Sequence, residues 1–276
     1  MSKKQYWNSE AKNERWIKEG RGQGTGSSYK PWLTVRDVPS EGRSHRVFGH
    51  LTHRTHHLLS DLELATFLLL QWRPSVTDIR EQFPLDRHLT RDICERLGVK
   101  HPSYKGVDQY MSSDYVVDSK EKDSPRFVIQ VKSKESFTSP RTIEKLQIER
   151  CYWREKGTPF FLVTENQIPR TVFENLNLLY NHNGNHDLSD PSELLFQFEL
   201  FLEQLKTNRN ARVIDLCIHI DSTYDQDPGE SLYQIKRLLA QRYFHFDISK
   251  PFTELRCSDL NAESVDLFRE EQCVPG

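Results

Sequence analysis

The residues best suited to chemistry lie in two short segments with the alternation of β-strands, residues 114–118 and 127–132. The charged, turn-prone break between them predicts a β-hairpin. Successive side chains on a strand point to opposite faces, so Gln130 and Lys132 share one face of the second strand. If the hairpin closes with Asp114 on that same face, the three side chains come close together.

A carboxylate, a neutral oxygen donor and a lysine on one surface suit a magnesium-dependent phosphodiester hydrolase. Polar residues on one face of an antiparallel hairpin are, however, usually the solvated side of a sheet. The pattern Asp-x(n)-Gln-x-Lys also matches many sequences by chance. The hairpin alone leaves both interpretations open and favours the solvated face.

A further carboxylate, Glu63, stands in the first turn of a helix that is predicted to begin after Ser60. Ser60 and Glu63 have the spacing of a capping box, in which the glutamate reaches back to the N-cap amide. Alternatively, Glu63 projects toward the hairpin and holds a metal ion. The spacing alone favours the cap.

The elements around the hairpin predict the sheet that must position these side chains. Residues 77–83 have strand character, and Ser139-Pro140 supplies an N-cap and a first-turn proline for a helix to about residue 156. Residues 159–164 form an apolar strand that we expect to be buried. A crossover helix after a hairpin makes the last strand parallel to its neighbour, so the expected fold class is α/β with a mixed sheet.

Length, charge and cysteine content narrow the class of protein. The chain has 276 residues, a formal net charge of −2 and 28% charged residues, which argues against a nucleic-acid coat with a strong basic excess. Its apolar runs are too short for a membrane span, and its first residues form no apolar signal segment. Five scattered cysteines fit reduced thiols, so we expect a cytoplasmic protein without disulfides or a zinc cluster.

Two polar stretches near the N-terminus admit more than one interpretation. The glycine-rich residues 19–28 lack a Walker motif, and they fit a linker better than a flexible arm that would follow DNA through Arg21. The second stretch contains histidines at positions 45, 50, 53, 56 and 57. No cysteine partners or helix pair accompany these histidines, so we expect surface or nucleic-acid-facing positions in a hairpin rather than a zinc site.

The composition changes after about residue 165 and predicts a second, mainly helical domain. Helices are expected over residues 171–180, 192–206, 212–224 and 227–241. A small hairpin formed by residues 243–255 should follow them. Helices followed by a hairpin are typical of a winged-helix domain, although any small helical domain would also fit. In the winged-helix interpretation, Lys236 and Arg237 lie on the recognition helix and are candidate DNA contacts.

Six runs of residues, mostly in the N-terminal half, carry a more specific signal than the hairpin. They occupy residues 19–24, 31–35, 56–63, 78–85, 106–109 and 130–132. In these runs the chain resembles the TnsA family, the endonuclease subunits of heteromeric cut-and-paste transposases. The resemblance implies a restriction-endonuclease-like mixed-sheet domain at residues 1–168. It also implies a winged-helix domain for partner and DNA binding at residues 169–276.

The catalytic residues of that family correspond to Glu63, Asp114, Gln130 and Lys132 in this sequence. This correspondence favours a metal site for Glu63, which can still cap its helix. Related nucleases usually carry Glu or Asp where Gln130 stands, but the TnsA family has this glutamine. The resemblance implies that Glu63, Asp114 and Gln130 hold Mg²⁺, in a site for two ions that also accepts Mn²⁺.

The resemblance also implies a place in a transposition machine. The protein would hydrolyse the 5′ strands at transposon ends, while a partner transposase handles the 3′ ends and a regulatory ATPase binds the C-terminal domain. One alternative is a non-catalytic adaptor between the transposase and the ATPase, which the presence of all four site residues disfavours. Another is a free-standing repair nuclease, which the near-neutral charge disfavours because phosphate contacts dominate DNA affinity.

Overall fold

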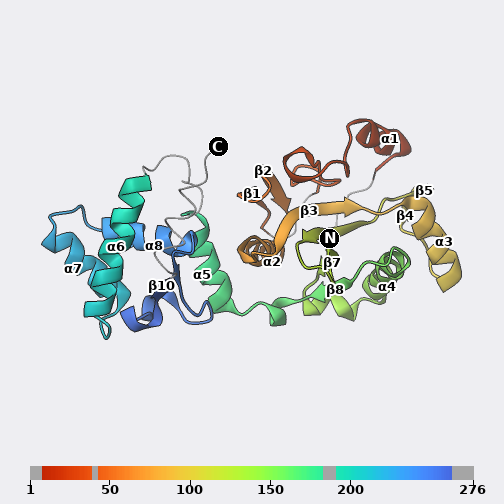
Figure 1. Ribbon diagram of the computed structural model, residues 1–276. Helices are drawn as coiled ribbons and strands as arrows, with labels where there is room; N and C mark the ends of the chain where they lie inside the picture. Colours follow the sequence, from red (N-terminus) through yellow and green to blue (C-terminus); the bar gives the residue numbers. More distant parts are fainter. Residues whose placement is uncertain (1–7, 39–42, 183–190, 263–276) are drawn as a thin grey trace. The chain divides into compact units, whose positions relative to one another are not determined.

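The computed structural model describes residues 8–38, 43–182 and 191–262 (Figure 1). The chain divides into two compact units, Met1–Ile168 and Pro169–Gly276. The first unit combines a mixed sheet with helices, and the described part of the second is mainly helical. Among the described residues, no helix has both the length and the apolar character needed to cross a membrane.

A four-stranded sheet forms the centre of the first unit. Its strands, in spatial order, are β3 (Val76–Pro84), β6 (Ser112–Ser119), β7 (Arg126–Val131) and β8 (Phe160–Val163). The pairs β3–β6 and β6–β7 are antiparallel, whereas β8 runs parallel to β7. The predicted α/β class with a mixed sheet and a parallel last strand is therefore confirmed.

The predicted hairpin consists of β6 and β7. Val116 lies opposite Val128, and Asp118 lies opposite Arg126, so the even-numbered residues of both strands share one face. The β-branched and aromatic residues of these strands suit a pleated surface that is buried on both sides. Asp114 follows the same parity, which puts it on the face predicted from the sequence.

The last strand differs from the sequence prediction. We expected residues 159–164 to be buried, but Phe161 is 52% exposed and Leu162 is 39% exposed. The reason is the position of β8, which pairs only with β7 and forms an edge of the sheet. An apolar run predicts a strand here, but it does not show whether that strand lies inside the sheet or at its edge.

One face of the sheet is covered by α3 (Arg87–Leu97) and α4 (Pro140–Glu155), which pack against each other (Figure 1). As predicted, α4 is the crossover helix between β7 and β8, and the Ser139 hydroxyl caps it by accepting from the Thr142 N–H. The core on this face contains Leu85, Ile93, Cys94, Val116, Val128, Ile148, Cys151, Tyr152 and Trp153.

The other face receives α2 (Asp61–Trp72). Tyr115 points to this face because it has the opposite parity to Val116. Its hydroxyl donates to the Glu63 carbonyl oxygen at 2.9 Å. The side chain of Tyr115 is fully buried, so this hydrogen bond fixes the start of α2 against β6.

The N-terminal segment begins with α1 (Glu10–Lys18) and continues through the glycine-rich loop and η1 (Gly26–Ser28). The loop folds back on itself, with the Gly22 N–H donating to the Lys30 carbonyl at 2.6 Å. A Cβ at Gly22 would lie 2.2 Å from the Pro84 ring, and the residue has a φ of +78°, so glycine is required there. The loop is therefore packed onto the end of β3.

Two short hairpins complete the first unit. The first pairs β1 (His45–Gly49) with β2 (Arg54–Leu58), and the second pairs β4 (Ser103–Tyr104) with β5 (Val107–Asp108). The hairpin expected in the histidine-rich stretch is therefore present.

A buried charge network attaches the β1–β2 hairpin to β3. The Glu81 carboxylate is fully buried and accepts two hydrogen bonds from the Arg54 guanidinium, at 2.9 and 2.6 Å, and one from His56 Nδ1 at 2.8 Å. Burial by itself would raise the pKa of Glu81, but His56 and Arg54 lower it to about 2. The expectation of a surface position is wrong for His56, whose side chain is fully buried because Glu81 and Thr52 hydrogen-bond both ring nitrogens.

Replacing Glu81 with alanine should therefore reduce the free energy of unfolding by about 3–5 kcal/mol, because Arg54 would remain as an unpaired buried charge. The measurement is the midpoint of urea unfolding of the full chain. Glu121→Ala is the matched control, since its ion pair with Arg73 is exposed to solvent and should contribute little to stability. Equal stability losses in the two variants would contradict the structural role of the buried network.

The second unit is built from α5 (Arg170–Tyr180), α6 (Pro191–Thr207), α7 (Val213–Thr223) and α8 (Glu230–Ala240). These helices match the four that the sequence predicts. Apolar side chains from all four helices are buried and form the core of this unit, among them Leu176, Leu179, Phe198, Phe201, Leu216, Ile220, Ile235 and Leu238.

The predicted C-terminal hairpin has a different second strand. We expected residues 243–255 to pair among themselves, but β9 (Phe244–His245) pairs with β10 (Asn261–Ala262), and Phe252–Glu254 forms a short 3₁₀ helix. The Asn175 amide explains the path of the chain between the strands, because it donates to the carbonyl oxygens of Ile248 and Lys250, both at 2.8 Å. This long-range contact leaves no periodicity in the sequence.

The cysteines of the described residues are all free and buried: Cys94, Cys151, Cys217 and Cys257. This agrees with the prediction of reduced thiols, and the fifth cysteine, Cys273, lies outside the described residues. The described part of the chain also contains no group of three or more His, Cys, Asp or Glu side chains that could hold a metal ion.

Candidate active site

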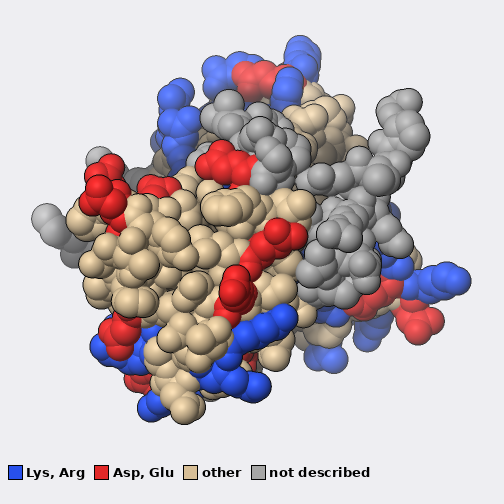
Figure 2. All heavy atoms as spheres, turned by 60° about the vertical axis from the view of Figure 1, so that its left-hand side comes forward, with Lys and Arg blue, Asp and Glu red and all other residues tan. Residues whose placement is uncertain are grey.

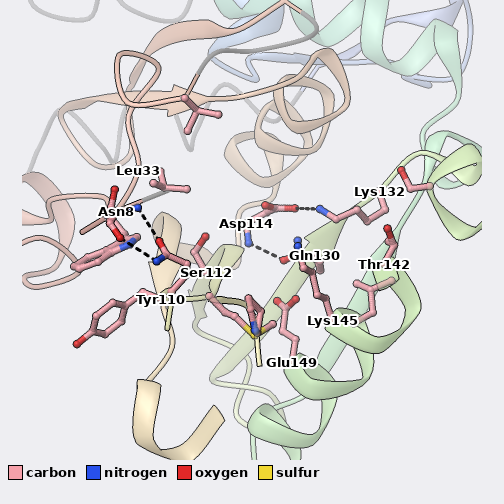
Figure 3. Close-up of a pocket in the computed structure, with 17 residues that line it drawn as sticks. Asn8, Leu33, Tyr110, Ser112, Asp114, Gln130, Lys132, Thr142, Lys145 and Glu149 are labelled. Carbon is pink, nitrogen blue, oxygen red and sulfur yellow. Dashed lines mark hydrogen bonds and ion pairs between the residues drawn. The ribbon is translucent and has the colours of Figure 1, made fainter. Parts of the chain in front are cut away.

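The centre of the candidate site is the contact between Asp114 on β6 and Gln130 on β7 (Figure 3). The backbone N–H of Asp114 donates to Gln130 Oε1 at 3.0 Å, and the backbone N–H of Val131 donates to Asp114 Oδ2 at 2.8 Å. Both side chains are buried. These bonds fix the carboxylate and the amide relative to the sheet, so little side-chain freedom remains to be lost when a ligand binds.

Lys132 follows directly after β7 and returns toward the same carboxylate. Its Nζ lies 3.5 Å from Asp114 Oδ2 and donates to the Val131 carbonyl at 2.8 Å. Burial would lower the pKa of Lys132, but the nearby carboxylates of Asp114, Glu149 and Glu63 together raise it. The lysine is therefore a permanent cation at neutral pH.

Glu63 occupies the first turn of α2, and only half of the predicted capping box forms: Ser60 caps the helix, but the Glu63 carboxylate does not bind the Ser60 N–H. Its Oε2 accepts from the Leu59 N–H at 2.9 Å, and its Oε1 accepts from the Ser60 hydroxyl at 3.1 Å. In return, the Glu63 N–H donates to Ser60 Oγ at 3.1 Å. The carboxylate therefore reaches the amide one residue before the N-cap.

Gln82 joins Glu63 to Asp114. Its amide nitrogen lies 3.4 Å from Glu63 Oε2 and 3.2 Å from Asp114 Oδ1, and its amide oxygen accepts from the Ser112 hydroxyl at 3.1 Å. Gln82 has a φ of +48°, so β3 departs from extended geometry at this residue. Sequence reasoning missed Gln82, because the regular alternation of a strand does not indicate such a kink.

Glu149 is a second residue that sequence reasoning missed. It lies on α4, is 3% exposed, and accepts from the Ser113 hydroxyl at 2.5 Å. Trp153 Nε1 in turn donates to Ser113 Oγ at 2.8 Å. Burial and the charge of Asp114 raise the pKa of Glu149 to about 8. The available signal was that a glutamate stands among the apolar positions of the predicted helix, where a charged side chain is unusual.

The electrostatics of the carboxylate pair favour a cation. Burial and the charge of Asp114 raise the pKa of Glu63 to about 8. Two carboxylates that share a water-poor site repel each other, and a bound divalent ion relieves this repulsion. Glu63, Asp114 and Gln130 can each offer a side-chain oxygen atom, and oxygen atoms are the ligands of hard cations such as Mg²⁺. The residues therefore fit a divalent metal.

The site opens into a cavity of about 510 Å³. Asp114, Gln130 and Lys132 line the cavity from the sheet, and Lys145 and Glu149 line it from α4 (Figure 3). The cavity gives a substrate access to three of the four candidate residues. Glu63 is connected to this group through Gln82.

None of the three candidate DNA contacts is among the residues that line this cavity. Arg21 is held inside the N-terminal segment, where it donates to Asp37 at 2.7 Å and lies over the Trp16 ring at 4.0 Å. In the second unit, Lys236 lies 5.7 Å from the Phe252 ring centre, and Arg237 is 7% exposed. A basic residue type on a predicted helix or loop does not reveal whether its charge reaches the surface.

A mixed sheet that presents a carboxylate, an amide and a lysine to an open cavity, with the carboxylate of Glu63 joined to them from α2, suits a metal-dependent nuclease. Comparison with known proteins agrees with this class. The family model "TnsA-like endonuclease N terminal" matches residues 73–165, and "TnsA endonuclease C terminal" matches residues 167–248.

The chain is also 46% identical to the Transposon Tn7 transposition protein TnsA of Escherichia coli over 266 residues, which is 96% of each chain. The chain therefore belongs to the TnsA endonuclease family, and it is a DNA endonuclease. Both matched domains agree with the resemblance seen in the sequence.

Proposed function

We propose that this protein is the subunit of a transposase that hydrolyses the 5′ strands at the ends of a mobile DNA element. The observation that carries the proposal is the clamped cluster of Asp114, Gln130 and Lys132 in the wall of an open cavity. Similarity to a transposition protein over 96% of both chains supports the transposon end as the substrate. The DNA and a partner transposase belong to this assembly, in which the partner processes the 3′ ends.

The proposed roles follow from the chemistry of each side chain. Glu63 and Asp114 supply negative charge for Mg²⁺, and Gln130 adds a neutral oxygen; Mn²⁺ should substitute because it accepts the same oxygen ligands. When bound, a pair of such ions stabilises the charge on the reacting phosphate and makes water a better nucleophile. Lys132 provides a fixed positive charge that offsets the negative charge that builds on the phosphate oxygens. Gln82 orients both carboxylates because its amide nitrogen donates to each of them.

We infer that the second unit is a winged-helix domain that binds the regulatory ATPase and contacts DNA. The arrangement of α5 to α8 followed by the β9–β10 pair supports this fold. In that interpretation α8 is the recognition helix, and Lys236 is the better placed of its two candidate contacts because Arg237 is buried. Arg21 remains a proposed contact that would require release from Asp37.

The protein should be nearly inactive without its partners. Its formal net charge is −2, and the side displayed in Figure 2 mixes Lys and Arg with Asp and Glu around a broad uncharged area. Because contacts from Lys and Arg to phosphates dominate non-specific DNA affinity, the protein alone should hold DNA weakly. A partner that binds transposon ends raises the local DNA concentration, which can increase the effective affinity by about 10²–10⁴-fold.

The test is end-specific nicking at physiological salt with Mg²⁺, with and without the partner transposase and the ATPase. We expect cleavage only with the partners, and none when EDTA replaces Mg²⁺. Deleting residues 169–276 should remove regulation by the ATPase and leave the first unit folded. Efficient, end-specific cutting by the protein alone would contradict this dependence.

A further inference from the structure

A second cavity, also of about 510 Å³, lies next to the candidate active site. Pro102 and Lys145 line both cavities, so the two are adjacent and share a wall. The second cavity extends away from Asp114 along the start of α4 and the loop that follows α3. Any chain seated at Asp114 could continue into it past Lys145.

Basic residues line this second cavity. Arg141 and Lys145 come from α4, and Lys100 comes from the loop after α3. Residues 141 and 145 are four positions apart, so their side chains project from the same side of the helix. Together with Lys132 in the first cavity, they extend positive charge from the candidate active site toward Lys100.

Two of these cations lack a carboxylate partner. In the described part of the chain, neither Lys100 nor Lys145 forms an ion pair. Arg141 differs, because it pairs with Glu144 at 2.5 Å and donates to the Lys100 carbonyl at 2.6 Å. Arg141 therefore fixes the loop against α4, which leaves the ammonium groups of Lys100 and Lys145 for a ligand. Among the described residues that line this cavity, Glu144 is the one carboxylate, and it is paired with Arg141.

Lys145 is placed unfavourably unless an anion binds. Burial and the positive charges of Arg141 and Lys132 lower its pKa. Two cations at i and i+4 of a helix repel each other and destabilise it by a few tenths of a kcal/mol. A phosphate bound between Lys132 and Lys145 would offset the repulsion between these two ammonium groups, which makes an anionic polymer the natural occupant.

We propose that the second cavity binds the sugar–phosphate backbone of the cleaved DNA strand on one side of the scissile phosphate. Lys145 contacts the phosphate nearest the reaction, and Lys100 contacts one further along. Lysines act as point charges on phosphates, so these contacts fix the register of the strand without reading its sequence. This inference rests on the proposed function, because the strand enters the cavity from Asp114.

The test measures binding of the full-length protein to a short DNA duplex by fluorescence anisotropy, in EDTA and over a series of salt concentrations. The variant is Lys100→Gln/Lys145→Gln. The matched control is Lys120→Gln/Lys122→Gln, which removes the same charge from exposed positions in the β6–β7 turn, at the opposite end of β6 from Asp114. Each lost phosphate contact should make the slope of log K against log salt shallower by about 0.7–0.9.

We expect Lys100→Gln/Lys145→Gln to lose about 1.5 units of this slope and to bind at least about tenfold more weakly at low salt, whereas the control stays within about twofold. Lys145→Arg keeps the positive charge and should retain the slope of the unmodified protein. This variant therefore distinguishes loss of charge from loss of folding as the cause of weaker binding. Equal effects in the Lys100/Lys145 and control variants, or no measurable binding by the unmodified protein, would overturn the proposal. Because EDTA prevents metal-dependent cleavage, a failure of the nuclease assignment would leave this result unaffected.

Discussion

Replacing Asp114 with alanine should lower the rate of DNA cleavage by at least about 10³-fold, which corresponds to about 4 kcal/mol of transition-state stabilisation. The carboxylate accepts from the Val131 N–H and lies 3.5 Å from Lys132 Nζ, so its loss removes a metal ligand and leaves the lysine unpaired. Assembly with the partner transposase should persist, because the side chain faces a cavity and not the outer surface. The measurement combines a single-turnover cleavage assay with a co-purification assay.

The matched control for this variant is Asp118→Asn. Asp118 shares the face of Asp114 on β6, but it pairs with Arg80 and Arg126 away from the cavity. Its replacement should reduce stability and leave the cleavage rate of the folded protein nearly unchanged. Undiminished cleavage by Asp114→Ala would exclude Asp114 from the active site.

Replacing Lys132 with alanine should slow the chemical step by about 10²–10³-fold, the usual effect of removing one preorganised group that stabilises developing charge. A protonated lysine cannot ligate a metal ion, so the Mg²⁺ concentration that gives half-maximal activity should change far less than the rate. Both quantities come from one Mg²⁺ titration of single-turnover cleavage.

Lys134→Ala is the control, because Lys134 is exposed two residues further along the chain. Its rate and Mg²⁺ dependence should match those of the unmodified protein. If high Mg²⁺ restored the full rate of Lys132→Ala, the lysine would be acting through the geometry of the metal ligands and not on the phosphate.

Local patterns were sufficient to predict the part of the site that a single hairpin builds. Alternation along β6 and β7 put Asp114 and Gln130 on one face, and the register of the hairpin agrees. The Ser139-Pro140 signal likewise predicted the start of α4. These features depend on neighbours in the sequence, which periodicity and capping rules describe directly.

Features that depend on distant contacts could not be predicted in this way. The spacing of Ser60 and Glu63 explained the cap, but the approach of Glu63 to Asp114 through Gln82 requires packing of α2 against the sheet. Before the structure, only family resemblance connected Glu63 to the hairpin. Gln82 itself was hidden by a positive φ within a strand.

The predictions that the structure contradicts also failed because they depend on distant contacts. The exposure of β8 follows from its position at the edge of the sheet. The segment between β9 and β10 follows a path that is fixed by hydrogen bonds from Asn175 on α5. Burial of His56 follows from Glu81, which lies 25 residues away in the sequence. In each case the nearby residues were interpreted correctly as strand or hairpin, and the tertiary environment decided what became buried or paired.

The central claim is that Glu63, Asp114, Gln130 and Lys132 form a metal-dependent site that cuts one defined strand. The most direct test is a strand-resolved cleavage assay on transposon-end DNA labelled separately on each strand, with the complete set of partner proteins and Mg²⁺. When the partner transposase carries a mutation that abolishes its own cleavage activity, the unmodified protein should still cut the 5′ strands. Asp114→Ala should abolish these cuts. Persistent 5′-strand cuts with Asp114→Ala, or the absence of such cuts with the unmodified protein, would contradict the account.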